Sequence, residues 1–344
     1  MAQAPSKRPW HIVLLTCLFA CVLSSSCRDE PGETRPQVVL YCSVDQQIAE
    51  PIVAAFEEQT GIDVLPRFDT EASKTVGLVQ RIRAEASSPA ADVFWSSEVF
   101  HTIRLADEAL LAPYSSDTTE EWPTLFADPN GRWYGFALRG RVIAYNTERV
   151  TREEAPTQLE DTLDPKWKGR LVMASPEFGT TGGDVASWFA HYGPARAKEI
   201  LQRLRENDVR LVSGNSTAVR MVATGQADIC FTDTDDVYAG QRNGWPVAMH
   251  FLDQGGDGVL AIPNTAALIA GGPHREAAGE LMEFLLSEQL EQMLVESDSH
   301  NSPIHEDLAA KHRSYAIDDP LDVSYEKVAQ FLPIAIETAR EVLR

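Results

Sequence analysis

Three aspartates lie within four residues of one another, at Asp233, Asp235 and Asp236. They directly follow the apolar segment 229–231, which is typical of a buried strand, and α/β proteins bind ligands in loops at the carboxyl ends of parallel strands. Carboxylates this close repel one another unless a cation or several hydrogen-bond donors share the site. Aspartates are also frequent at helix N-caps and exposed turns. We therefore expect at least one of the three to face a ligand, without requiring all of them to do so.

A glycine-rich segment with two threonines spans residues 179–183 and contains Thr180, Thr181 and Gly182. It follows the expected strand 171–174 and opens a helix that we expect to begin near Val185. The backbone N–H groups at such a turn, together with two hydroxyls, form a suitable cradle for an anion. The same segment is equally consistent with a simple glycine-rich start of a helix.

Two further acids follow expected strands in the N-terminal part of the chain. Asp45 comes after the apolar segment 38–41, and Glu98 comes after the segment 91–95. Four strand ends therefore offer acidic or hydroxyl groups, and we expect them to face one crevice.

The common catalytic motifs are absent from the sequence. It has no G-x-S-x-G, H-E-x-x-H, G-x-G-x-x-G or Walker segment, and its 8 histidines are scattered and not paired at metal-ligand spacing. One enzymatic interpretation stays open, in which an exported hydrolase or transferase uses Asp235 or Glu98 as a general base. Its weakness is that no nucleophile or metal triad is visible from spacing.

Composition narrows the class of protein further. The chain has 344 residues, of which 44% are hydrophobic and 24% charged, enough for two globular domains. Asp and Glu number 51 against 30 Lys and Arg, so the formal net charge of -21 disfavours nucleic acid as a partner. The apolar run 12–23 is shorter than the roughly 20 residues that a spanning helix needs, which excludes a multi-pass membrane protein.

The N-terminus has the organisation of a secretory signal. Lys7 and Arg8 precede the apolar run, and small residues then lead to Cys27. This order resembles the lipobox of bacterial lipoproteins, with Cys21 as an alternative to Cys27 for the lipidated residue. We expect residues 1–26 to be a signal peptide and 27–37 a lipid-anchored tether. A plain signal peptide or an uncleaved N-terminal anchor would also place the body of the protein outside the cytoplasm.

The remaining sequence alternates between strand and helix patterns. Segments 38–41, 62–65 and 91–95 are strand-like and are separated by helical periodicity, which predicts a β-α-β-α-β unit with a parallel sheet. A second unit is expected over 142–231, and the strand-like segments 259–262 and 266–269 with the helix 274–295 are expected to return to the first. Cys42 and Cys230 lie in apolar segments, so we expect two buried free thiols and no disulfide framework.

Several segments resemble the bacterial extracellular solute-binding proteins of ABC importers, and most narrowly the ferric-ion-binding periplasmic group. The resemblance is carried by 41–45, 54–62 and 88–95 in the first lobe, and by 165–170, 215–216 and 225–228 in the second. It implies an α/β, two-lobed periplasmic-binding-protein fold of type II-like organisation, in which each lobe is a parallel-dominated sheet flanked by helices and a hinge joins the two. It also implies a monomer that performs no reaction and hands a small solute to a membrane permease, driven by an ATPase subunit.

The resemblance further implies boundaries for these lobes. Residues 38–138 and 259–322 would form lobe 1, and 139–258 lobe 2. The C-terminal helix 323–344 is assigned to neither lobe, since it could pack on either. The segments 136–142 and 253–258 would be the two crossings at the hinge.

The site residues that the resemblance implies only partly match this group. Asp45 falls where ferric binders commonly place a histidine ligand, and Glu98 lies within one position of their glutamate ligand. Thr180, Thr181, Gly182 and Asn215 fall where such proteins hold a synergistic anion. The tandem tyrosines that serve them as principal iron ligands are replaced here by Asp235 and Asp236, with Tyr238 nearby. This departure argues against tyrosinate coordination.

Three classes of ligand therefore remain. Asp45, Glu98, Asp235 and Asp236 would provide hard oxygen ligands for Fe³⁺, Mn²⁺, Mg²⁺ or Ca²⁺, with or without a bound anion. The same acidic crevice would suit an organic cation such as an amine, with Trp95 or Tyr41 as a cation–π wall. An oxyanion or phosphonate would instead be held by Arg139, Arg141 and the 179–183 segment.

Overall fold

The computed structural model describes residues 35–69 and 73–344. The expected signal peptide, Cys21 and Cys27 lie outside the described residues, as does most of the expected tether. None of the helices in the described part of the chain is both long and apolar enough to cross a membrane.

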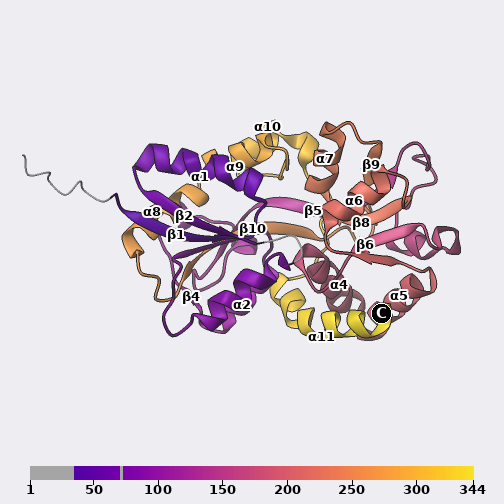
Figure 1. The fold of residues 1–344 in the computed structure, drawn as a ribbon, viewed down its shortest axis with the longest axis horizontal. Coiled ribbons are helices and arrows are strands. Elements are labelled where there is room, and N and C mark those ends of the chain that lie inside the picture. The colour runs from indigo at the N-terminus through magenta and orange to yellow at the C-terminus, as the bar shows by residue number, and fades with distance from the viewer. Residues whose placement is uncertain (1–34, 70–72) are drawn as a thin grey trace, which may run out of the picture. The chain divides into compact units, whose positions relative to one another are not determined.

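The first half of the fold contains the expected β-α-β-α-β unit (Figure 1). Its elements are β1 (Gln37–Cys42), α1 (Gln46–Thr60), β2 (Asp63–Phe68), α2 (Val76–Ala84), β3 (Val93–Ser96) and α3 (Phe100–Asp107). Strand β1 lies between β2 and β3 and is parallel to both. Helix α1 ends at Gly61, whose φ of 71° is the left-handed conformation that glycine adopts most easily.

Both faces of this sheet are buried, which explains the apolar strand sequences. Leu40 and Cys42 share a hydrophobic cluster with α1 and the later helices α8 (Arg275–Leu285) and α9 (Glu288–Glu296). Tyr41 points to the opposite face, where it belongs to a cluster with α2 and α3. Successive strand residues point to opposite faces, so a strand covered on both sides needs apolar residues at every position.

The second half repeats this arrangement around β6, which lies between β7 and β8. Its elements are β6 (Leu171–Ala174), α4 (Gly179–Tyr192), α5 (Pro194–Glu206), β7 (Arg210–Val212), α6 (Asn215–Ala223), β8 (Ile229–Asp233), α7 (Thr234–Arg242) and β9 (Val247–His250). Strand β6 is parallel to both β7 and β8. Cys230 packs towards α6 and α7, and Phe231 packs towards α4 and α5.

Two long antiparallel strands join the halves. They are β5 (Tyr134–Asn146) and β10 (Ala261–Ile269), and the strand order is β2-β1-β3-β10-β5-β8-β6-β7, with β4 (Leu111–Ala112) on β10 and β9 on β5. The two strand-like segments expected at 259–262 and 266–269 are thus one strand, whose register shifts at Pro263 and Asn264. The α/β, two-lobed class is confirmed. The parallel pairing is confined to three strands in each half, and β5 and β10 add antiparallel pairing between them.

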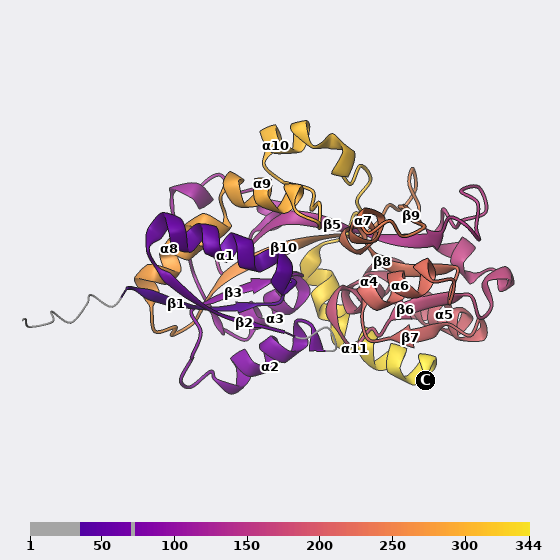
Figure 2. The same ribbon diagram turned by 45° about the horizontal axis from the view of Figure 1, so that its top comes forward.

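The chain returns to the first half through α8 and α9, as expected. The single helix expected at 274–295 is two helices, because the hydroxyl of Ser287 accepts the N–H of Leu290 and starts a new helix. The last helices are α10 (Glu306–Lys311) and α11 (Tyr325–Leu343), and short 3₁₀ turns lie at Asp117–Thr119, Thr124–Phe126, Leu159–Leu163, Pro165–Trp167 and Arg313–Tyr315. Figures 1 and 2 show α11 along α4 and α5, and it also packs against α3.

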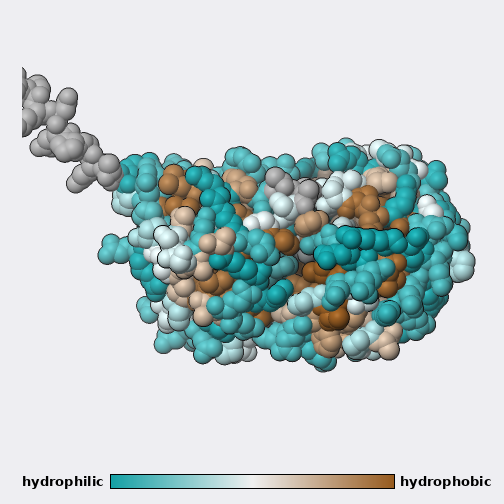
Figure 3. All heavy atoms as spheres, turned by 60° about the horizontal axis from the view of Figure 1, so that its bottom comes forward, coloured by the Kyte–Doolittle hydropathy of each residue, from teal (hydrophilic) through white to brown (hydrophobic). Residues whose placement is uncertain are grey.

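One face of the molecule is mainly polar. On the face that carries α2 and α11, hydrophilic residues predominate and hydrophobic ones are scattered in small groups (Figure 3). This matches the large excess of acidic residues over basic ones.

Cys42 and Cys230 are buried free cysteines, which confirms the expectation from the sequence. Burial raises the pKa of both thiols far above the usual range, so almost no thiolate forms at neutral pH. We expect neither thiol to react with a soluble maleimide in the native protein, and both to react in denaturant. Peptide mapping by mass spectrometry measures each site separately. Modification of either residue without denaturant would contradict this expectation.

Candidate functional site

A polar cavity, partly open to solvent, lies where the ends of the strands in the two halves meet. Asp45 follows β1 and Ser97 follows β3, while Thr180 and Asp233 come from the second half. The full lining is Asp45, Lys74, Ser97, Arg139, Ala174, Phe178, Gly179, Thr180, Thr181, Ser213, Gly214, Asn215, Asp233, Asp235 and Asp236. The expected convergence of strand ends on one crevice is therefore present in the fold.

The three aspartates after β8 form the acidic part of this cavity. Asp233 ends β8 as the N-cap residue of α7, and Asp235 and Asp236 lie in the first turn of that helix. One carboxylate oxygen from each of the three lies within 4.8 Å of the others. The N-terminus of a helix stabilises negative charge, which helps the fold to hold three carboxylates together.

Asp235 is paired on one side only. Its Oδ2 lies 2.7 Å from Nη1 of Arg139, and its Oδ1 is buried without a hydrogen-bond partner. Burial raises the pKa of Asp235 above its usual range, although the Arg139 guanidinium acts in the opposite direction. A buried oxygen with no donor is an open coordination position for a ligand.

Asp236 has the most strongly perturbed carboxyl group of the cavity. Burial raises its pKa well above the usual range, and repulsion from Asp235 and Asp233 adds to this effect. Its Oδ2 accepts a hydrogen bond of 3.3 Å from the Thr232 hydroxyl. A cation bound here would remove the repulsion, so the site favours positive ligands.

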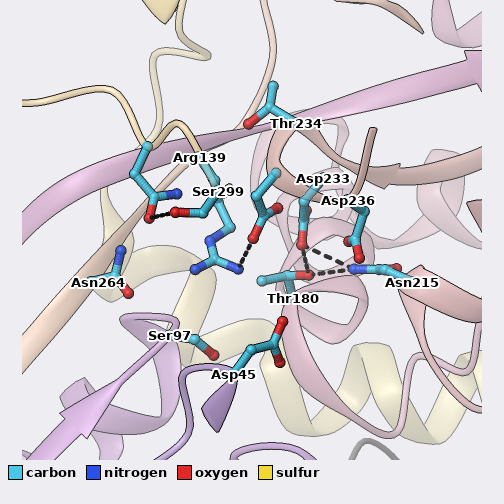
Figure 4. A network of polar contacts seen from close by, with 12 residues as sticks. Asp45, Ser97, Arg139, Thr180, Asn215, Asp233, Thr234, Asp236, Asn264 and Ser299 are labelled. Carbon is cyan, nitrogen blue, oxygen red and sulfur yellow. Dashed lines mark hydrogen bonds and ion pairs between the residues drawn. The ribbon is translucent and has the colours of Figure 1, made fainter. Parts of the chain in front are cut away.

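Asp45 faces this cluster from the first half (Figure 4). Its carboxylate lies 2.5 Å from Nζ of Lys74. Burial on its own would raise the pKa of Asp45, but the Lys74 ammonium outweighs that effect and the pKa lies below its usual value.

Asp233 is held differently from its two neighbours. Its Oδ1 accepts from Nη1 of Arg141 at 2.7 Å. Its Oδ2 accepts from the Thr180 hydroxyl at 2.5 Å and from Nδ2 of Asn215 at 2.9 Å (Figure 4). Arg141 is buried, does not line the cavity, and also contacts Asp184 at 3.1 Å. Arg139 and Arg141 therefore both face carboxylates of the protein.

Glu98 does not line the cavity. It is fully buried, and its carboxylate accepts hydrogen bonds from the backbone N–H groups of Phe100 and His101 at 2.7 and 3.2 Å. It also lies 3.1 Å from Nδ1 of His101. The Glu98 carboxylate thus accepts hydrogen bonds from the free backbone N–H groups at the start of α3. Ser97, and not Glu98, follows β3 into the cavity lining. We therefore leave Glu98 out of the proposed ligand set.

Two residues of the glycine-rich segment, Gly182 and Thr181, differ in their relation to the cavity. Gly182 is absent from the lining, and a Cβ there would lie 2.7 Å from the carbonyl oxygen of Pro176, so this position needs glycine for packing. Thr181 lines the cavity, and its hydroxyl donates to Oδ1 of Asn215 at 3.1 Å.

The aromatic wall expected from Trp95 or Tyr41 is not formed. Both side chains are buried in the sheet, and the Tyr41 hydroxyl donates to Glu85. Tyr238 lies outside the lining and packs edge-on against His300 and Tyr315, each at 5.3 Å between ring centres. Burial raises the pKa of Tyr238 to about 12.

Lys74 and Ser213 line the cavity but were not singled out from the sequence. Each follows a strand of the sheet, Lys74 after β2 and Ser213 after β7. The rule that ligands bind at the carboxyl ends of parallel strands applies to both residues. It would have found them had it been extended to these two short strands.

Known proteins are similar to this chain in sequence and fold. The family model of bacterial extracellular solute-binding proteins matches residues 88–323. "Iron uptake protein A1" of Synechocystis sp. is 29% identical over 318 residues, which cover 87% of each chain. Among solved structures, the ferric binding protein from Campylobacter jejuni superposes with a TM-score of 0.79 at 24% identity, covering 89% of this chain and 99% of that one. A Trichodesmium protein in complex with iron and citrate ligands gives 0.74 at 23% identity, covering 89% and 98%.

The family match covers most of the described chain, and both superpositions include the two halves and the strands that join them. The chain belongs to the bacterial extracellular solute-binding proteins.

Proposed function

We propose that this protein captures ferric iron, or another metal ion that prefers oxygen ligands, and delivers it to the permease and ATPase subunits of an ABC importer. The observation that carries the proposal is the cluster of Asp233, Asp235 and Asp236, in which Oδ1 of Asp235 is buried without a donor. The names of the relatives, one an iron uptake protein and one a ferric binding protein, support iron as the ion.

The charge of the cavity supports a cationic solute. Its lining contains four carboxylates, from Asp45 and the three clustered aspartates, against the two cations Lys74 and Arg139. Fe³⁺ is a hard ion that is well matched to carboxylate oxygen. We infer a site built from carboxylates, in which Asp235 and Asp236 are the principal ligands and Asp45 closes it from the first half.

Binding without chemistry is also part of the proposal. Among the described residues, neither a histidine nor a cysteine lines the cavity. The family to which the chain belongs consists of solute-binding proteins, which supports this part of the proposal.

We place the hinge near the middle of β5. Residues 134–140 of β5 pair with β10, and residues 141–145 pair with β8. This change of partner supports lobe boundaries close to residue 139, with the return crossing near 258. We further propose that Cys27 is lipidated and tethers a monomeric protein to the membrane.

Metal content and stability measurements test the proposed solute. The protein is purified without chelators, its metals are determined by elemental analysis, and its melting temperature is recorded with Fe³⁺, Mn²⁺, Ca²⁺ and a panel of amines and phosphonates. A ligand that binds only the folded state must raise its stability. We expect stoichiometric iron, or an increase in melting temperature that is largest with Fe³⁺. An increase with amines or phosphonates alone would overturn the metal assignment.

Metal binding should weaken as the pH falls. The raised pKa values of Asp235 and Asp236 mean that protons compete with the metal at a higher pH than for ordinary carboxylates. Isothermal titration in two buffers of different ionisation enthalpy should detect protons released on binding, with the number increasing at lower pH. Binding that releases no protons between pH 5 and 7 would contradict this expectation.

A further inference from the structure

Three hydrogen-bond donors from three separate elements converge on the carboxylate of Asp233. Thr180 lies in the first turn of α4, Asn215 is the first residue of α6, and Arg141 lies in β5. All three donate to Asp233, as described above, and Nδ2 of Asn215 also lies 2.9 Å from the Thr180 hydroxyl. Asp233 is 1% exposed, so its hydrogen bonds are shielded from water.

This set of donors has the chemistry of a binding site for a free anion. Two helix N-termini, a hydroxyl, an amide and a guanidinium together favour negative charge. The sequence suggested such a cradle in the 179–183 segment. In the fold, the cradle is occupied by a carboxylate of the protein, and both of its oxygens are engaged by the three donors.

The Asp233 carboxylate also belongs to the cluster of three aspartates that is proposed to hold the metal. One of its oxygens lies within 4.8 Å of oxygens from Asp235 and Asp236. It therefore stands between the donors of the cradle and the carboxylates proposed to hold the ion. A free anion that joined the metal to these donors would need the same place, and it would meet a buried negative charge there.

We propose that Asp233 is the built-in anion of this site, so that the metal binds without carbonate, citrate or phosphate from solution. The metal part of this inference rests on the proposed function. The occupation of the cradle by Asp233 does not, because it follows from the hydrogen bonds alone.

Removing the carboxylate and supplying it from solution tests the inference. Asp233→Ala leaves Arg141 with Asp184 as its partner and opens a space the size of formate. Fe³⁺ is supplied from a hydroxypyridinone chelator, which has no carboxylate that could enter the cradle. We expect the variant to lose roughly 10- to 100-fold in Fe³⁺ affinity, because a buried negative charge beside the ion is removed, and formate to restore most of it. Formate should leave the affinity of the wild-type protein unchanged.

Asp236→Ala is the matched control. It removes a carboxylate from the same cluster, but Asp236 accepts from Thr232 and not from the three cradle donors. Formate should therefore not restore its affinity. Equal rescue of the two variants, or an increase in wild-type affinity with formate, would overturn the inference. Asp233→Asn keeps the side-chain volume and should preserve the fold. We expect this variant to lose Fe³⁺ affinity and formate not to restore it, because the amide still fills the cradle.

A metal-free measurement separates this inference from the proposed function. Formate should raise the melting temperature of Asp233→Ala and leave that of the wild-type protein unchanged at matched ionic strength. This result would stand even if Fe³⁺ failed to bind either protein. An equal response of both proteins to formate would show that the cradle is open to solution anions, contrary to the inference.

Discussion

Asp236→Asn is expected to lower the affinity for Fe³⁺ and, at the same time, to raise the melting temperature of the metal-free protein. The two effects have opposite signs because the Asp236 carboxylate is useful only when a cation is present. In the metal-free state it is buried beside Asp235 and Asp233, and its pKa is raised well above the usual value. A carboxyl group whose pKa is raised on folding costs stability when ionised, so the neutral amide should be better tolerated.

The sizes of the two effects are large enough to measure. Loss of a carboxylate ligand should weaken metal binding by about 100-fold, or ~2.7 kcal/mol. Single substitutions with a defined mechanism typically change stability by about 0.5–3 kcal/mol, and relief of the repulsion among the three carboxylates should make this change stabilising. Each kcal/mol corresponds to roughly 1.5 °C in melting temperature for a chain of this size.

The pH dependence gives a second readout for the same variant. The metal-free wild-type protein should gain stability as the pH falls through the raised pKa of Asp236, because the proton removes the buried charge. This gain should shrink in Asp236→Asn. Asp322→Asn makes the same charge change at an exposed position and serves as the control. If both variants altered stability and metal affinity equally, Asp236 would have no special role.

The position of strand ends in the sequence predicted much of this site. Asp45, Asp233 and Asp235 follow short apolar segments that are buried on both faces of a sheet, and such segments are recognisable without a structure. Because the carboxyl ends of parallel strands meet at one edge, residues distant in sequence lie close together. The same reasoning correctly separated the chain into two α/β halves.

Which side chains after the strands face the cavity was less predictable. Glu98 follows β3 as closely as the rule requires, but its side chain turns back to the N–H groups at the start of α3. A helix start and a ligand site both demand an acceptor after a strand, and spacing does not distinguish them. Trp95 lies two residues before Ser97, within the strand, and its ring is therefore buried in the sheet.

The donors around Asp233 depend on contacts between distant elements. Arg141 is 92 residues from Asp233 in the sequence, and Thr180 is 53 residues away. Each looked like part of a site for an external anion when considered alone. Only the fold shows that Asp233, a residue of the protein, accepts a hydrogen bond from each of them, which changes the expected ligand requirement of the site.

Arg141→Met is expected to cause the largest loss of stability among single substitutions near the cavity. Arg141 is 4% exposed, and it lies 2.7 Å from Asp233 and 3.1 Å from Asp184. Burial already raises the pKa of Asp184, even with the guanidinium beside it. Removing the cation would leave both buried carboxylates without a cationic partner, with Asp233 keeping only its hydrogen bonds from Thr180 and Asn215. Breaking a buried ion pair in this way typically costs about 3–5 kcal/mol. Urea denaturation of the metal-free protein measures this loss.

An exposed arginine in a similar ion pair provides the comparison. Arg149 pairs with the buried carboxylate of Asp228, but its side chain is 51% exposed, and Arg170 contacts the same carboxylate. Arg149→Met should therefore cost less than about 1 kcal/mol. Adding Asp184→Leu to Arg141→Met should recover part of the loss, because one uncompensated charge is then removed. If Arg141→Met cost no more than Arg149→Met, the buried ion-pair network would not be what holds Asp233 in the cradle.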